Sequence, residues 1–142
     1  MSLIRVISAL CILIYSAGAI AEDKFITIHD YMALKRADPD DPYIAYVVLL
    51  RCTIVFKTMQ EIAGNNNEYD AAKTAANTAH KFIEKMSTFQ TKAKVSDAAF
   101  ADDAKMYYDI YADRLKKNQA LTGHFFTEPT YVSDLATCKE LL

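Results

Sequence analysis

The cysteines have the clearest chemistry of any residues in this sequence. Cys52 and Cys138 lie far apart in the chain, and Cys11 lies in an apolar run near the N-terminus. A metal site would need further ligands close to them, and a redox pair usually has Cys-x-x-Cys spacing, which this pair lacks. In an oxidising compartment, two buried cysteines form a structural disulfide. We therefore predict a Cys52–Cys138 disulfide and leave Cys11 out of it.

The N-terminal segment explains why Cys11 is left out. Arg5 lies in a short polar start, an apolar run follows over 6–15, and Ala19-Ile20-Ala21 provides small residues for cleavage. This pattern is typical of a secretory signal peptide, and the run is shorter than the roughly 20 apolar residues of a spanning helix. We expect residues 1–21 to be removed, leaving a mature chain without a membrane span. The destination is a periplasm or the exterior, and the lack of an Asn-x-Ser/Thr site favours a bacterial periplasm.

Arg51 is the second residue with candidate chemistry, because it borders the apolar sector of its predicted helix. A charge in such a place needs a counterion, which can be an anionic ligand or an acid of the same chain such as Asp103 or Asp109. The first alternative predicts a small-ligand or haem carrier. Its candidate contact residues are Arg51, Tyr46, Leu50, Tyr107 and Tyr111.

Local motifs for catalysis are absent from the sequence. Three glycines leave no phosphate-binding loop, and no Gly-x-Ser-x-Gly, His-Glu-x-x-His or Cys-x-x-Cys-His pattern occurs. His29, His80 and His124 lie among polar or loop residues, and the methionines have the positions of core residues. The chain resembles exported haem bundles of the cytochrome b562 type in fold class alone, so we predict no metal and no cofactor. An enzyme with a non-local site is the third hypothesis.

The elements that position these residues are predicted to be helices. Asp41-Pro42 starts and Gly64 stops a helix over about 42–63, with Cys52 at the centre of its apolar sector. β-Branched residues in the middle of this segment also favour a strand, but its length and paired end signals favour a helix. Periodic apolar stripes predict three more long helices and a short N-terminal one. Their ranges are about 67–94, 97–121 and 128–141, and about 28–37. We therefore predict an all-α, single-domain bundle over 22–142, tied by one disulfide.

The first half of the 42–63 helix carries a surplus of apolar residues. They project from the side opposite the main sector, and they are Tyr43, Tyr46, Val47, Leu50 and Ile54. Either a helix of the same chain covers them or they form a contact surface for a protein partner. The net charge of −2 without a basic block excludes nucleic acid as a partner. The preferred hypothesis is a small, exported, non-enzymatic interaction protein, with its oligomeric state left open.

Overall fold

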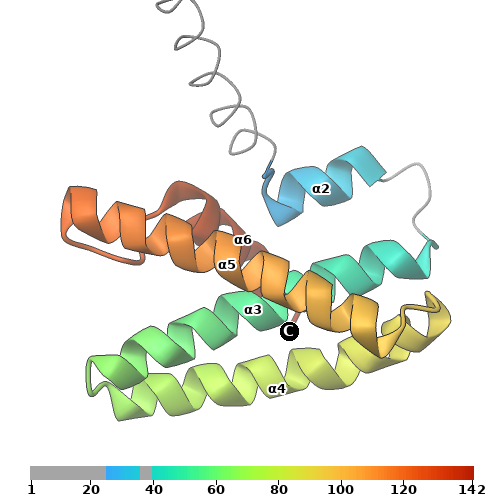
Figure 1. The fold of residues 1–142 in the computed structure, drawn as a ribbon, viewed down its shortest axis with the longest axis horizontal. Coiled ribbons are helices and arrows are strands. Elements are labelled where there is room, and N and C mark those ends of the chain that lie inside the picture. Colours follow the sequence, from blue (N-terminus) through green and yellow to red (C-terminus); the bar gives the residue numbers. More distant parts are fainter. Residues whose placement is uncertain (1–24, 36–39) are drawn as a thin grey trace, which may run out of the picture.

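A computed structural model describes residues 25–35 and 40–142, and every regular element in these two ranges is an α-helix (Figure 1). The helices are α2 (Ile28–Lys35), α3 (Pro42–Asn65), α4 (Tyr69–Lys92), α5 (Asp97–Thr122) and α6 (Pro129–Glu140). This arrangement confirms the predicted all-α bundle of four main helices with a short N-terminal helix. The predicted signal peptide at 1–21 lies outside the described residues and stays a prediction.

Helix α3 is the centre of the bundle, because α2, α4, α5 and α6 all pack against it. Every residue from Tyr46 to Phe56 is buried, so the middle of α3 lies inside the bundle. In Figure 1, α4 runs back along α3 after a tight turn, and α5 crosses over α3. A helix that is apolar around its whole circumference belongs in a core, and α3 takes that place.

The length and hydropathy of α3 would also suit a membrane-crossing helix. In the structure, 67% of its most apolar window is buried by the rest of the chain. This degree of coverage is typical of the core helix of a bundle, whose apolar side chains contact protein on every side.

The predicted start signal at Asp41 caps α3, and Ser96 caps α5. The Asp41 carboxylate accepts a hydrogen bond from the backbone N–H of Tyr43 at 2.8 Å, and the Ser96 hydroxyl accepts one from Ala99 at 3.1 Å. Each bond satisfies a backbone donor that has no partner inside the helix. Gly123, which follows the last residue of α5, adopts the left-handed conformation with φ 80°.

The turn between α3 and α4 corrects one predicted signal. Gly64 is helical, and the left-handed residue is Asn67, with φ 61°. The N–H of Asn67 bonds to the Gly64 carbonyl, and the N–H of Glu68 bonds to the Ala63 carbonyl. Asparagine tolerates this conformation, so it closes the helix where glycine was expected to do so. The first long helix therefore extends to Asn65, and the predicted 67–94 helix begins at Tyr69.

The predicted disulfide is confirmed. Cys52 of α3 and Cys138 of α6 are bonded, with 5.5 Å between their Cα atoms, and both residues are fully buried. The bond ties the central helix to the C-terminal helix across 86 positions of sequence. A buried structural disulfide of this kind indicates an oxidising, extracellular compartment.

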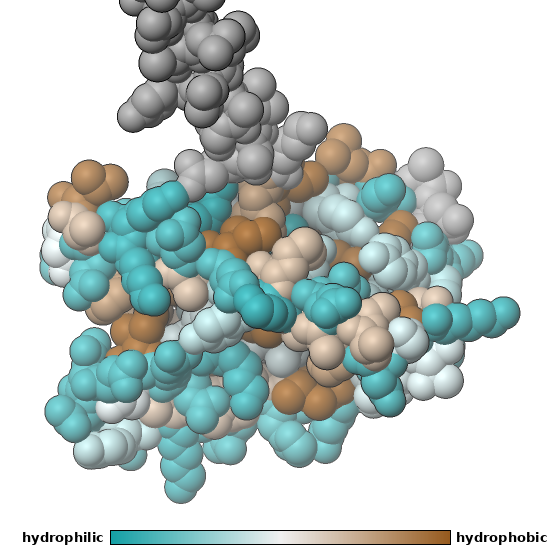
Figure 2. All heavy atoms as spheres, in the orientation of Figure 1, coloured by the Kyte–Doolittle hydropathy of each residue, from teal (hydrophilic) through white to brown (hydrophobic). Residues whose placement is uncertain are grey.

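The stripe predicted for α4 faces α3. Its buried residues are Ala75, Ala79, Phe82 and Met86, and Phe82 stacks on Phe56 of α3 with 5.8 Å between ring centres. Helices α4 and α5 each pack against α3 rather than closely against each other. Figure 2 shows polar side chains over most of this face of the molecule, with apolar side chains visible between α5 and α4.

Candidate functional site

Arg51 lies in a closed polar cluster at the centre of the bundle. Only 2% of its surface is exposed. Its Nη2 donates to Asp134 Oδ2 at 2.8 Å and to the Ile26 carbonyl at 2.8 Å, and its Nε donates to Tyr111 Oη at 3.2 Å. The counterion is thus Asp134 of α6, rather than Asp103 or Asp109 as weighed from the sequence.

Asp134 collects donors from three parts of the chain. Besides the Arg51 guanidinium, the Tyr111 hydroxyl donates to Oδ2, and the Ile28 backbone N–H donates to Oδ1 at 2.6 Å. Burial raises the pKa of the Asp134 carboxyl, and the positive charge of Arg51 together with these hydrogen bonds opposes that rise. The carboxylate therefore joins α2, α3, α5 and α6 at one point.

Sequence reasoning missed Asp134, although a signal for it was present. Asp134 lies three positions after Tyr131 and four before Cys138, so it lies on the inward edge of the last helix. An acid on an apolar edge is the natural partner for a base on another apolar edge, and Arg51 is such a base. The pairing needed only this comparison between two helices.

Aromatic rings complete the surroundings of Arg51. Its guanidinium carbon lies 4.4 Å from the ring centre of Phe25, 5.7 Å from that of Tyr107 and 5.9 Å from that of Tyr111. Burial raises the pKa of Tyr107 to about 12 and that of Tyr111 well above its usual value. The structure thus brings together three of the predicted contact residues, Arg51, Tyr107 and Tyr111, in a cluster in which Arg51, Tyr111 and Asp134 hydrogen-bond to one another.

The predicted apolar face of α3 is covered by its own chain. Tyr46, Val47, Leu50 and Ile54 are buried, and only Tyr43, at 45%, is substantially exposed. The Tyr46 hydroxyl donates to Asp103 of α5 at 3.0 Å, which joins this end of α3 to α5. Of the two alternatives drawn from the sequence, cover by a helix of the same chain therefore holds for most of the face.

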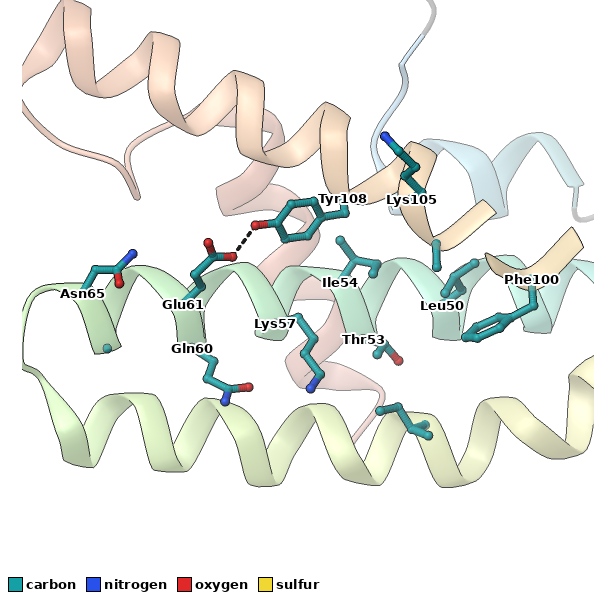
Figure 3. Close-up of a pocket in the computed structure, with 13 residues that line it drawn as sticks. Leu50, Thr53, Ile54, Lys57, Gln60, Glu61, Asn65, Phe100, Lys105 and Tyr108 are labelled. Atoms are coloured by element: carbon teal, nitrogen blue, oxygen red, sulfur yellow. Dashed lines mark hydrogen bonds between the residues drawn. The ribbon is translucent and has the colours of Figure 1, made fainter. Parts of the chain in front are cut away.

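Leu50 and Ile54 lead to an open site beside this covered face. They lie on the floor of a cavity of about 760 Å³ that opens between α4 and α5, which we name the α4–α5 groove (Figure 3). The floor comes from α3 and the walls from Ile83 of α4 and from α5. The main lining residues are Leu50, Thr53, Ile54, Lys57, Gln60, Ile83, Phe100, Ala104 and Tyr108.

The exposed surface of the groove is mostly apolar, but seven of its thirteen lining residues are polar or charged, and these point in different directions. In Figure 3, Lys57 and Gln60 extend from α3 toward α4, whereas Glu61 extends toward α5. The Tyr108 hydroxyl donates to the Glu61 carboxylate, and this bond raises the pKa of Tyr108. Among the described residues, Gln60 Oε1 is the one buried side-chain oxygen or nitrogen without a hydrogen-bond partner.

A second cavity continues the groove along α3 and α5. It measures about 220 Å³ and has apolar walls from Ile62, Leu115 and Phe125. Glu61, Asn65 and Tyr108 border both cavities. The Tyr108–Glu61 hydrogen bond therefore lies at the boundary between the two parts of one elongated site.

The histidines lie away from both regions and are exposed. His29 pairs with Asp30 and His80 with Glu84, each at 3.3 Å, on the surface. Within residues 25–35 and 40–142, no group of three or more His, Cys, Asp or Glu side chains could hold a metal ion. Neither region thus assembles a recognisable set of catalytic groups from these residues.

The fold and site define a disulfide-tied helical bundle with one closed polar cluster and one open apolar groove. No protein family, no curated protein and no solved structure matches this chain. Its function must therefore be argued from the described geometry.

Proposed function

We propose that this protein is a small, exported, non-enzymatic binding protein that acts through the α4–α5 groove. The predicted signal peptide and the buried disulfide both support export, and we assign the mature chain to the bacterial periplasm or the exterior. The proposal takes up the small-ligand alternative from the sequence in place of the preferred protein-interaction role, and it moves the binding site from Arg51 to the groove.

The observation that carries the proposal is the combination of size and lining in the groove. Pockets that bind small molecules typically have volumes of about 300 to 1,000 Å³ and apolar walls with a few polar groups. The α4–α5 groove, at about 760 Å³, has this character.

The Arg51 cluster is the weaker candidate for the same role. Arg51 and Asp134 bind each other, and the Tyr111 hydroxyl binds the same carboxylate. An anionic ligand would have to displace Asp134 and leave that carboxylate buried without its countercharge, which is costly. A haem or small-ligand site at Arg51 is therefore not the function we propose.

Filling the groove tests the proposal. Ala104 of α5 lines the groove, so Ala104→Trp would fill part of it, and Ala104→Leu would fill less. Ala101 is exposed one turn earlier and is not part of the lining, so Ala101→Trp is the matched control. The full chain of each variant would be exported from its natural host, purified without detergent and measured by native mass spectrometry.

We expect the wild-type chain and Ala101→Trp to carry a non-covalently bound molecule that Ala104→Trp lacks. Thermal unfolding of the three proteins shows whether the loss of ligand is separate from loss of fold, and Ala104→Leu gives an intermediate occupancy. An identical ligand-free mass for the wild-type chain and every folded variant would contradict the proposal.

A further inference from the structure

We infer that the ligand of the α4–α5 groove is a free, single-chain amphiphile with an anionic head group, such as a long-chain carboxylate. Its chain would lie against the partly exposed side chains of Ile83 and Phe100, and its head group would bind Lys57. This inference rests on the proposed function, because it names the chemical class that the groove would bind.

The charges around the groove favour an anion at one point. Lys57 is exposed, and it makes no ion pair within residues 25–35 and 40–142. The other charges of the lining are engaged: Lys105 pairs with Asp109, and the Glu61 carboxylate accepts from Tyr108. An anionic head group beside Lys57 would therefore meet a cation whose charge is not already compensated by a neighbouring acid.

The directions of these side chains separate Lys57 from the acid in the groove. Figure 3 shows Lys57 extending toward α4 and Glu61 extending toward α5, although they lie one helical turn apart. Lys105 extends away from the floor. The head group is thus expected on the α4 side of the groove, where Glu61 does not face it.

The shape of the site favours a chain over a compact molecule. The cavities of about 760 and 220 Å³ share Glu61, Asn65 and Tyr108 at their boundary and follow the same two helices. Both have walls of aliphatic and aromatic side chains, which gain free energy in proportion to the apolar area that they bury. A long acyl chain can extend from Lys57 along the larger cavity toward Phe100.

A docked protein helix fits the groove less well. Lys57 and Gln60 stand on the floor and would lie at the centre of such an interface, whereas charged residues are depleted from the centres of protein interfaces. A small anion needs only one cation and an apolar wall. A protein partner is therefore an outcome of the test and not the proposal.

The experiment compares three ligands that share one chain and differ in charge. Decanoate, 1-decanol and decyltrimethylammonium would be titrated calorimetrically, below their micelle-forming concentrations, into the disulfide-bonded mature chain. The variants are Lys57→Met, which removes the cation, and Lys81→Met, which removes an exposed lysine of α4 outside the lining. Ala104→Trp, with its control Ala101→Trp, reports whether binding occurs in the groove.

We expect decanoate to bind about fivefold more tightly than decanol, since a solvent-exposed ion pair contributes up to about 1 kcal/mol. Decyltrimethylammonium is expected to bind most weakly. Lys57→Met should abolish the difference between decanoate and decanol, and Lys81→Met should keep it. Ala104→Trp should weaken the binding of all three ligands.

Equal affinities for decanoate and decanol in the wild-type chain would overturn the inference. If both were lost in Ala104→Trp, the groove would still be a binding site and the proposed function would stand. If Ala104→Trp left the affinities for the ligands unchanged, the ligands would bind outside the groove and the inference would be overturned. Association with phosphatidylglycerol vesicles, or with an acidic helical peptide, in the absence of decanoate binding would overturn it in favour of a membrane or a protein partner.

Discussion

Two basic residues on one helix, Arg51 and Lys57, have opposite surroundings. Arg51 is 2% exposed, and its guanidinium contacts Asp134, Tyr111 and the backbone of Ile26. Lys57 is exposed in an apolar groove, and no acid among the described residues pairs with it. A buried charge must find its partners within the chain, whereas an exposed charge in a groove is free to meet a ligand.

The comparison of Arg51 with Lys57 shows which of the two charged side chains lies at a candidate functional site. From sequence alone, Arg51 is the more conspicuous residue, because it interrupts an apolar stretch. Its partners make it part of the structural core, together with the adjacent disulfide of Cys52. Lys57 looks like an ordinary surface lysine, and it gains interest only from the apolar walls around it. The more unusual residue in the sequence therefore serves the fold, and the ordinary one borders the candidate site.

The closed region is the core around Arg51, Asp134 and the Cys52–Cys138 disulfide. Removing the disulfide should cause the largest loss in its free energy of unfolding. The bond spans 86 positions, and a loop of this length corresponds to about 4 to 5 kcal/mol of stability in the chain-entropy treatment. We expect the Cys52→Ala/Cys138→Ala double variant to lose about that much free energy of unfolding in urea. Reduction of the wild-type chain should give a similar loss. A change below about 1 kcal/mol would contradict the view that this bond ties the closed region together.

High pH should destabilise the closed region by a smaller amount. Tyr131 and Tyr111 are fully buried, and burial raises the pKa of Tyr131 to about 12 and that of Tyr111 well above its usual value of 10.0. Above pH 10 these tyrosines ionise in the unfolded chain but stay protonated in the folded one. The contribution of these tyrosines to the free energy of unfolding is therefore fully present below pH 10 and is lost as the pH rises further.

The loss should be about 1.4 kcal/mol per pH unit for each buried tyrosine above pH 10. Urea unfolding between pH 9 and 11 measures it, and tyrosinate absorbance of the native protein provides the control. If the absorbance showed every tyrosine ionised at pH 11 while the protein stayed folded, the described burial of Tyr111 and Tyr131 would be wrong.

The sequence allowed most of the fold to be predicted, because local rules act on it. The side chains of Asp41 and Ser96 cap the starts of two helices, and Gly123 ends α5 in the left-handed conformation that glycine adopts easily. The apolar sector around Cys52 placed its sulfur inside, and the structure pairs it with Cys138. The exception was the turn after α3, where Asn67 takes the left-handed conformation in place of Gly64. Both glycine and asparagine can adopt this conformation, so the position of Gly64 alone did not decide where the helix ends.

The candidate site was less predictable because it depends on the relative placement of helices. Leu50 and Ile54 were expected on an exposed face or beneath another helix, and they line a groove because α4 and α5 both pack on α3 and leave space between them. No spacing within one helix encodes that separation. The Arg51–Asp134 pair, in contrast, was within reach of the sequence, because Asp134 shares the inward edge of the last helix with Tyr131 and Cys138.

One pair of substitutions tests the contrast between the two regions most directly. Arg51→Met and Lys57→Met make the same kind of change on the same helix, and their free energies of unfolding can be measured in urea. We predict a loss of about 3 to 5 kcal/mol for Arg51→Met, because Asp134 is left buried without its counterion, and a partial recovery in Arg51→Met/Asp134→Leu. Lys57→Met should change the value by less than about 0.5 kcal/mol. Equal losses in the two single variants would contradict the account of one closed and one open region.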